Sequence, residues 1–271
     1  RAQLCVHCRK LISSDETQCP HCGAKNPTLW GLGDQFRRML SGQFNPVFAV
    51  IAACIGLYVI TLVANPSQAL QGGLMRAGSP DQRMLYLFGM TGGAAWEWGH
   101  WWTLLTANYL HGGFLHIVFN VIWLNRLGTF VSVLLGPARF LVVFTVTGVT
   151  GFLLSNVYSG VPTIGASCSI LGLIGMMVGL SRRWPGCLNP AAVRELIACT
   201  VFCLFFGFVI PGINNAGHIG GFLGGFGLAW VFPVRRAPEG ISTLMVAGVM
   251  VLLTVASFGL SLWQMWTPVF G

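Results

Sequence analysis

Three polar clusters stand in otherwise apolar stretches of this chain, and their side chains could together catalyse hydrolysis. His218 lies in the glycine-rich run 214–225, which contains no acidic residue. His116 and Asn120 stand four residues apart and so share one helix face, while Ser167 lies in a third apolar region. An ionisable side chain at membrane depth is costly and by default indicates a functional site. A serine, a histidine and a His/Asn pair are the nucleophile, base and oxyanion donors that serine hydrolysis needs.

Each of these residues has a plainer interpretation when it is taken alone. A transmembrane serine often bonds to its own helix backbone, Asn120 could join two helices by a hydrogen bond, and His218 could be packed in a core. Gly221 and Gly225 form a G-x-x-x-G face, which is common where helices pack closely. The joint occurrence of the polar residues on three segments favours the functional interpretation.

The positions of the acidic residues limit which catalytic groups the chain can assemble. None of them falls at the depth of His218; they are Asp15, Glu16, Asp34, Asp81, Glu97, Glu195 and Glu239. A Ser-His-Asp triad therefore cannot be assembled, and a Ser–His dyad is the hydrolase that the sequence allows. The same distribution argues against a carboxylate-driven proton pump or antiporter.

The first 26 residues carry a different chemistry, that of a metal site. Two C-x2-C knuckles, Cys5-Val-His-Cys8 and Cys19-Pro-His-Cys22, stand about ten residues apart. Each knuckle places two thiolates on one tight turn, and two knuckles complete the tetrahedron that Zn²⁺ prefers. A disulfide pair and an iron site are the alternatives. We expect residues 1–26 to form a zinc ribbon, which is so small that it needs its metal to fold.

The composition is that of a polytopic membrane protein. Of the 271 residues, 54% are hydrophobic and 8% are charged, against about 25% charged in soluble proteins, and the mean hydropathy is +0.71. The net charge of +8 could suggest nucleic-acid binding, but the basic residues are scattered in short loops and not clustered on one face. Such a distribution is typical of residues that set the topology of a membrane protein. The five cysteines beyond the knuckles are expected to be small buried hydrophobes.

The elements that must position the polar clusters are seven apolar segments within a membrane domain, residues 44–271, which follows a linker at 27–43. The predicted spans are 44–64, 114–134, 138–157, 167–181, 191–210, 217–233 and 241–264. The fourth and sixth are short and rich in glycine, which suits central helices shielded by protein. The predicted fold is an all-α bundle of membrane-spanning helices.

The basic residues predict the orientation of the bundle. With the N-terminus in the cytoplasm, thirteen Lys and Arg residues fall inside and only Arg76 and Arg83 fall outside. Arg126 is the weakest of the thirteen, because it falls within the second predicted span. The zinc ribbon is then cytoplasmic, which argues against a disulfide there, and the C-terminus is outside. All three polar clusters fall at the outer ends of their spans. The long outer loop 65–113 contains four tryptophans within residues 96–102, which suits a membrane interface or a substrate entrance.

These residues resemble the rhomboid family of intramembrane serine proteases over about 44–264. The motifs that carry the resemblance, in the family's order, are His111-x4-His116-x3-Asn120, Gly165-x-Ser167, and His218 followed by Gly221-x3-Gly225. The resemblance implies a bundle of six helices plus one. It also implies that Ser167 is the nucleophile, His218 the base, and His116, Asn120 and the Ser167 backbone N–H the oxyanion donors. His111, Gly165 and Cys168 would line the substrate site, with the fifth span and the long loop flanking substrate access.

Two positions depart from the family pattern. Cys168 stands where the family usually has the last glycine of Gly-x-Ser-Gly, and its side chain could narrow the oxyanion pocket. Thr103 follows Trp102 where the family has arginine. The sequence therefore predicts a protease of transmembrane substrates in the bacterial inner (plasma) membrane, with a protein rather than nucleic acid as the partner of its zinc ribbon. The alternative is a catalytically silent rhomboid-like protein that acts as a scaffold or a subunit of a membrane complex.

Overall fold

The computed structural model describes residues 2–5, 8, 10–13, 16, 18–24, 45–64, 78–210, 212–232 and 239–266. The chain divides into two compact units, Arg1–Ala49 and Val50–Gly271. The predicted linker at 27–43 lies outside the described residues, as do residues 65–77 of the long loop.

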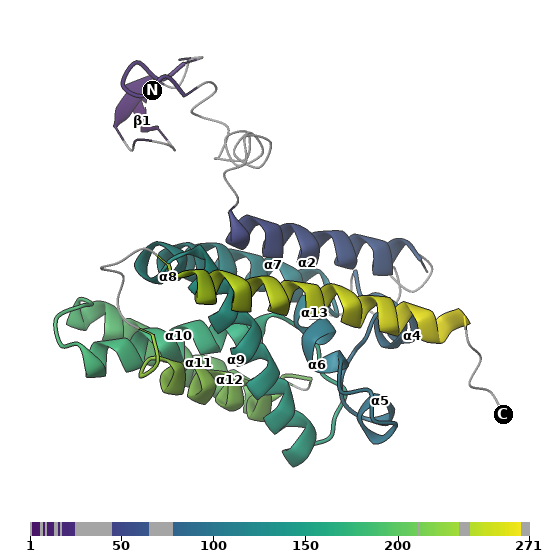
Figure 1. Ribbon diagram of the computed structural model, residues 1–271. Coiled ribbons are helices and arrows are strands. Elements are labelled where there is room, and N and C mark those ends of the chain that lie inside the picture. Colours follow the sequence, from purple (N-terminus) through teal and green to yellow (C-terminus); the bar gives the residue numbers. More distant parts are fainter. Residues whose placement is uncertain are drawn as a thin grey trace. The chain divides into compact units, whose positions relative to one another are not determined.

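The N-terminal unit is built on a small hairpin (Figure 1). Strands β1 (Ala2–Leu4) and β2 (Leu11–Ser13) pair antiparallel, with Gln3 opposite Ile12. Ile12 is buried with Cys5, Cys19 and Ala24. Because these few buried side chains supply little hydrophobic stabilisation, we expect the unit to need a further link between its two knuckles, such as a shared metal ion.

The second unit is all-helical. Its long helices are α2 (Pro46–Val63), α9 (Pro137–Tyr158), α11 (Pro190–Val209), α13 (Ile241–Trp266) and a continuous helix over Phe114–Leu135. These five are long and apolar enough to cross a membrane. The continuous helix consists of α7 (Phe114–Trp123), a π-helical turn η2 (Leu124–Gly128) and α8 (Thr129–Leu135). Arg126 therefore lies inside this helix, in η2, rather than in a loop.

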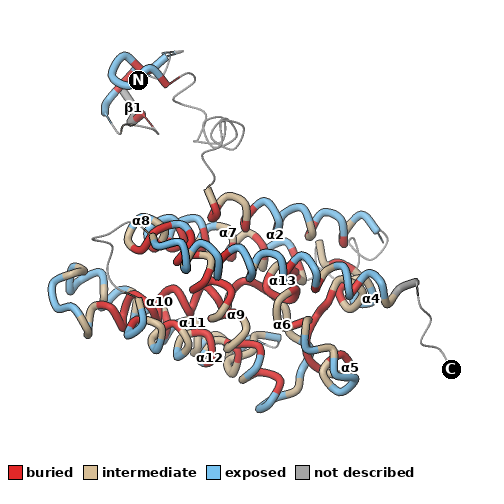
Figure 2. Tube along the Cα trace, in the orientation of Figure 1, coloured by how far each residue is buried: buried red, intermediate tan, exposed pale blue. Residues whose placement is uncertain are grey.

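Two of the seven predicted spans form shorter helices, α10 (Ser167–Arg183) and α12 (Asn215–Leu228). At about 1.5 Å per residue they measure roughly 26 and 21 Å, less than the roughly 30 Å of a bilayer core. α10 is an interior helix, buried from Cys168 to Leu180, and packs against α9 and α12 (Figure 2). α12 buries its glycine face, Gly217, Gly220, Gly221 and Gly225, and exposes Ile219 and Leu223. Protein rather than lipid surrounds α10, so it does not need to match the thickness of the membrane.

Glycines let these central helices approach closely. A Cβ on Gly225 of α12 would collide with the carbonyl of Gly172 on α10, and a Cβ on Gly221 with the carbonyl of Cys168. On the other side, a Cβ on Gly175 would collide with the carbonyl of Phe222. The G-x-x-x-G pair thus forms a packing face, and it holds α12 against the helix that begins at Ser167.

The described part of the long loop contains four short helices, α4 (Gln82–Leu87), α5 (Ala94–Glu97), α6 (Thr103–Thr106) and the 3₁₀ turn η1 (Ala107–Tyr109). His100 stacks on Trp102 with ring centroids 4.8 Å apart, and His100 Nε2 lies 3.2 Å from Gln264 Nε2 on α13. Desolvation lowers the pKa of His100. Trp98 and Trp101 are exposed.

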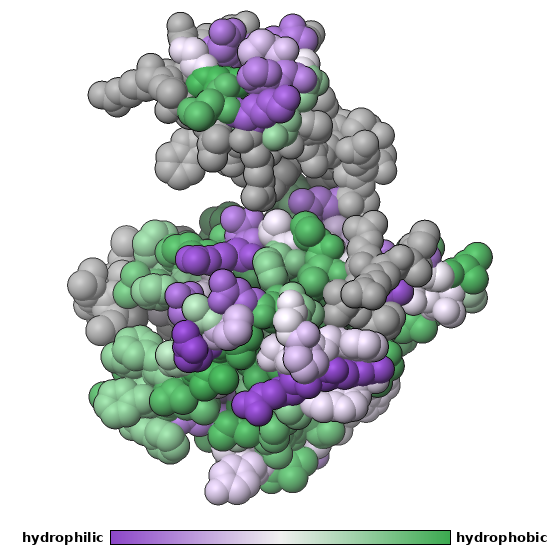
Figure 3. Space-filling model, turned by 90° about the vertical axis from the view of Figure 1, so that its left-hand side faces the viewer, coloured by the Kyte–Doolittle hydropathy of each residue, from purple (hydrophilic) through white to green (hydrophobic). Residues whose placement is uncertain are grey.

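Charged side chains gather at one end of this unit. Arg182 at the end of α10 and Arg194 near the start of α11 are exposed there. Figure 3 views this end and shows hydrophilic side chains, in purple, among apolar ones, in green.

The carboxylate of Glu239 accepts hydrogen bonds from the backbone N–H groups of Ala138 (3.2 Å) and Arg139 (2.8 Å), and so caps the start of α9.

Candidate active site and metal site

Ser167 and His218, which are 51 positions apart in the chain, lie side by side on two neighbouring helices. Ser167 Oγ lies 2.9 Å from His218 Nε2, within hydrogen-bonding distance. Ser167 is the first residue of α10 and His218 lies in the first turn of α12. Both residues are half-buried. The contact lets the Ser167 hydroxyl donate to a neutral imidazole, which is the starting arrangement for nucleophilic attack assisted by a base.

The backbone just before Ser167 is tightly constrained. Gly165 has a φ of +118°, a conformation that favours glycine, and its N–H donates to the carbonyl of Ala107 at 2.9 Å. A Cβ at position 165 would lie 2.5 Å from His116 Nε2. Gly165 therefore makes room for the His116 ring, which brings His116 beside the turn that leads into Ser167.

The other predicted site residues surround His116. His111 is fully buried and its ring lies edge-to-face with that of His116, with centroids 5.1 Å apart. His111 Nε2 is buried and has no hydrogen-bond partner among the described residues, and the same holds for Asn120 Oδ1. Asn120 Nδ2 donates to the carbonyl of His116 at 2.7 Å. No direct contact joins Asn120 to Ser167 within the part of the chain that is described.

The N-terminus of α10 provides a positive electrostatic environment at Ser167. The first backbone N–H groups of a helix have no partner inside the helix, and Ala166, which precedes α10, provides no side-chain cap. These N–H groups and the helix dipole favour negative charge beside Ser167 Oγ. The arrangement can stabilise an oxyanion that forms on a carbonyl attacked by this serine.

The two residues after Ser167 make structural contacts. Cys168 is 2% exposed and lies in a small apolar cluster with Ala107 and Phe152. Ser169 Oγ lies within hydrogen-bonding distance of Asn108 Oδ1 at 2.9 Å and of the Phe144 carbonyl at 2.6 Å. Of these three consecutive residues, only Ser167 faces a histidine.

Two asparagines at the start of α12 make contacts that the sequence motifs did not predict. Asn214 precedes α12 and its Oδ1 accepts a hydrogen bond from the N–H of Gly217 at 3.1 Å. Asn215 Nδ2 donates to the carbonyl of Leu204 on α11 at 3.0 Å. An asparagine before a helix is a common N-cap signal, so Asn214 could have been found from its place before an apolar run.

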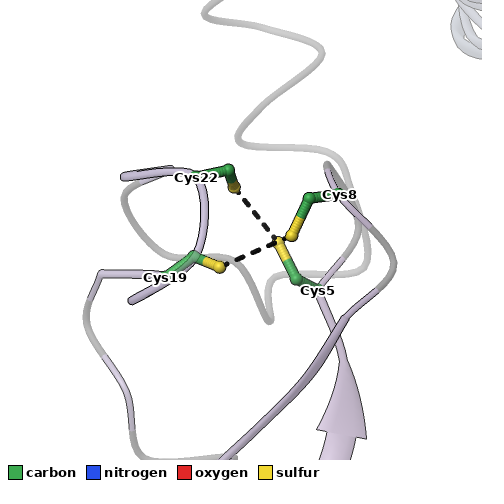
Figure 4. A group of neighbouring side chains, drawn as sticks. All are labelled: Cys5, Cys8, Cys19 and Cys22. Atoms are coloured by element: carbon green, nitrogen blue, oxygen red, sulfur yellow. Dashed lines mark hydrogen bonds between the residues drawn. The ribbon is translucent and has the colours of Figure 1, made fainter.

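The four predicted metal ligands lie together in the N-terminal unit (Figure 4). Their sulfur atoms are all within 4.8 Å of one another. Cys5 Sγ lies 3.8 Å from Cys22 Sγ, and Cys8 Sγ lies 3.7 Å from Cys19 Sγ. A tetrahedron with Zn–S distances of about 2.3 Å has S–S edges of about 3.8 Å, whereas a disulfide needs about 2.05 Å. The four thiols therefore fit a metal ion of zinc's size and do not form disulfides.

One of these thiols is shifted toward the form that binds metal. Desolvation raises the pKa of Cys19, but hydrogen bonds from the backbone N–H groups of His21 and Cys22 and from the thiols of Cys22 and Cys5 together outweigh it and lower the pKa to about 6, while the pKa of Cys22 in the same cluster is raised. The thiolate is the ligand form of cysteine.

Comparisons with known proteins identify the family of this chain. A family model described as Rhomboid domain matches residues 98–235, about half of the chain. The chain belongs to the rhomboid family. The match covers all the residues of the serine–histidine site, from His111 to His218.

Three relatives illustrate the range of this rhomboid family. The chain is 34% identical over 183 residues to Rhomboid protease GluP of Bacillus subtilis, which covers 67% of this chain and 36% of that protein. It is 35% identical over 144 residues to RHOMBOID-like protein 5 of Arabidopsis thaliana, covering 51% and 46%. It is also 32% identical over 126 residues to Inactive RHOMBOID-like protein 8 of the same plant, covering 45% and 35%. The chain thus spans between a third and a half of the length of these relatives.

Proposed function

We propose that this rhomboid is an intramembrane serine endopeptidase that cleaves transmembrane segments with a Ser167–His218 dyad. The observation that carries the proposal is the 2.9 Å contact between Ser167 Oγ and His218 Nε2. The family membership supports protease chemistry, because several relatives are named as proteases. Carboxylates play no part in this proposal.

In the proposed reaction, Ser167 Oγ attacks the scissile carbonyl carbon while its proton passes to His218 Nε2. The carbonyl oxygen becomes an oxyanion, which the N–H groups at the start of α10 stabilise together with His116. Asn120 can contribute its second amide N–H, because only one is used by the His116 carbonyl. His218 then returns the proton to the leaving amine, and water hydrolyses the acyl-enzyme in a second half-reaction.

The proposed substrate is a transmembrane helix that unwinds locally. A helical carbonyl is hydrogen-bonded within its helix, so it must be released before a serine can attack it. We place substrate access beside α11, whose only buried residue is Thr200. His111 lines the site behind His116, and Gly165 and Cys168 contribute through their backbone.

The remaining proposals concern topology and metal. The exposed arginines at the end of α10 and the start of α11 support a cytoplasmic location for that end, following the positive-inside rule. The N-terminus and zinc ribbon are then cytoplasmic and the C-terminus is outside the bacterial inner membrane. Cys5, Cys8, Cys19 and Cys22 would hold one structural Zn²⁺, and the ribbon would bind a protein partner.

A catalytically silent scaffold is the second candidate, and a relative named as inactive is the observation in its favour. Labelling by a serine-directed fluorophosphonate probe separates the two. The full chain should be labelled and should cleave a generic transmembrane substrate, and Ser167→Ala should abolish both. Ser169→Ala, two residues further along α10, is the matched control and should keep both probe labelling and cleavage. A well-folded parent that neither labels nor cleaves would favour the scaffold.

A further inference from the structure

Asn214 connects the two halves of the serine–histidine site. Its Nδ2 lies 2.6 Å from Ser155 Oγ, 3.2 Å from Ser159 Oγ and 2.9 Å from Thr163 Oγ1. Ser155 and Ser159 belong to the end of α9 and the residue after it, and Thr163 lies in the turn that leads to Ser167. One side chain thus reaches both α9 and the segment before the serine.

The hydrogen bonds of these hydroxyls decide which way the Asn214 amide points. Ser159 Oγ donates to the Ser155 carbonyl and Thr163 Oγ1 donates to the Val161 carbonyl, both at 2.8 Å. Ser155 Oγ can donate to Thr163 Oγ1 at 3.2 Å. With their protons used in this way, the three hydroxyls are left as acceptors for the two N–H groups of the Asn214 amide, so its NH₂ faces them and its Oδ1 faces the Gly217 N–H.

The other side of Asn214 holds the helix turn that carries His218. Its Oδ1 caps the N–H of Gly217, and its carbonyl accepts the backbone N–H of His218 itself at 3.2 Å. An uncapped first turn frays. His218 Nδ1 has no hydrogen-bond partner among the described residues, so no third side chain steers the imidazole. The ring position therefore depends on the backbone that Asn214 holds.

The segment on the serine side is equally fixed. Thr163 N–H donates to the Thr91 carbonyl at 2.8 Å, and Gly165 N–H donates to the Ala107 carbonyl at 2.9 Å. Thr163 is thus anchored by its backbone to the long loop and by its hydroxyl to Asn214. A change at Asn214 removes the side-chain bonds between the His218 turn and this frame, while the backbone bonds of Thr163 and Gly165 remain.

We propose that Asn214 is a positioning residue that sets His218 against Ser167, in place of the carboxylate that orients the histidine in a catalytic triad. The proposal rests on the proposed function, since Ser167 and His218 are taken as the reacting pair. Asn214 itself touches neither the substrate nor the reacting atoms. Its loss should therefore lower kcat and leave the KM for a transmembrane substrate unchanged.

The test uses the full chain and a readout that does not need protease activity. In a Ser167→Cys background, the rate of alkylation of the thiol at position 167 by iodoacetamide is followed against pH, and tandem mass spectrometry separates that thiol from the buried Cys168. A nearby imidazole promotes thiolate formation. Adding His218→Ala should move the profile to higher pH, and adding Asn214→Ser should move it at least half as far. Asn189→Ser changes an asparagine that caps α11 in the same way and should not move it.

Thr163→Val keeps the shape of the side chain, deletes the hydroxyl that accepts from Asn214, and should shift the profile in the same direction if Asn214→Ser does not fold. In the Ser167 background, Asn214→Ser should lower kcat at least tenfold. An alkylation profile that is unchanged by Asn214→Ser and Thr163→Val, or by His218→Ala, would overturn the positioning role. A parent that cleaves nothing, with a profile that still depends on Asn214, would instead refute the protease proposal and leave the positioning role standing.

Discussion

The Cys168 side chain fills the space opposite Gly217, the residue that precedes His218. A Cβ on Gly217 would lie 2.9 Å from Cys168 Sγ, and a Cβ on Gly151 of α9 would lie 2.7 Å from Cys168 Cβ. The side chain that departs from the usual Gly-x-Ser-Gly motif is therefore packed between α9 and α12. Two glycines make room for it.

This contact predicts a compensating pair of substitutions. Gly217→Ala should push α12 away from Cys168 and lower cleavage or probe labelling at least tenfold, because the added Cβ would lie 2.9 Å from the buried Cys168 Sγ. Cys168→Gly alone should keep activity, at a stability cost of about 1–2 kcal/mol for the lost buried side chain and the added helix glycine. The double variant should recover most of the activity that Gly217→Ala loses. Additive losses in the double variant would show that the two positions do not interact.

The Ser167–His218 contact predicts non-additive losses of activity. Ser167→Ala and His218→Ala should each reduce cleavage at least about a thousandfold, and the double variant should lose no more than either one, because the two groups act as a unit. Initial rates on a detergent-solubilised transmembrane substrate are the measurement. If Ser167→Ala kept activity and Cys168→Ala lost it, the nucleophile would be the cysteine.

The sulfur geometry predicts one zinc ion per chain. Elemental analysis of the purified full chain should give a stoichiometry near one, and Cys19→Ser should abolish it, because a three-thiolate site binds zinc far more weakly. Cys199→Ser on α11 changes an unrelated thiol and should leave the metal content unchanged. Removal of the metal by a chelator should increase hydrogen exchange at Leu11–Ser13. A metal content near zero with four reactive thiols would contradict this prediction.

The contact between Asn215 and α11 predicts a local attachment for the second half of this helix. Asn215 donates to the Leu204 carbonyl, and a Cβ on Gly207 would collide with the Asn215 side chain. Asn215→Ala should increase backbone hydrogen exchange around Leu204–Phe208, since few other contacts bury α11. Asn189→Ala should raise exchange only in the first turn of the same helix. Equal exchange at Leu204–Phe208 in the parent and Asn215→Ala would rule out this latch.

The cap on α9 predicts a charge effect on stability. Glu239→Gln removes the negative charge that faces the first N–H groups of α9 and should lower the free energy of unfolding by roughly 0.3–1 kcal/mol. Denaturant unfolding in a fixed detergent is the measurement. Glu195→Gln changes an exposed carboxylate on α11; it is the control and should change the free energy of unfolding by clearly less than Glu239→Gln does. Equal effects of the two substitutions would exclude a specific cap.

The sequence by itself determined the helical class, the family motifs and the candidate chemistry. Long apolar runs with few charges leave helices as the structure that satisfies the backbone in a membrane, so segments such as 138–157 could be placed to within a few residues. Single histidines and a serine in such runs are costly, so His116, Ser167 and His218 stood out without any coordinates. The knuckle spacing likewise marked the four cysteines, because two ligands on each tight turn are a local property.

The tertiary structure decided what depends on contacts between distant segments. The 2.9 Å approach of Ser167 to His218 depends on the glycines that let α12 lie against α10, and no local pattern encodes that distance. The direction of the Cys168 side chain depends on the space left by Gly151 and Gly217, which lie on other helices. Asn214 falls between two predicted spans, and only the folded structure brings three hydroxyls from elsewhere in the chain to its side chain. Hydrogen bonds and close packing between residues on different helices arise only once the helices are assembled.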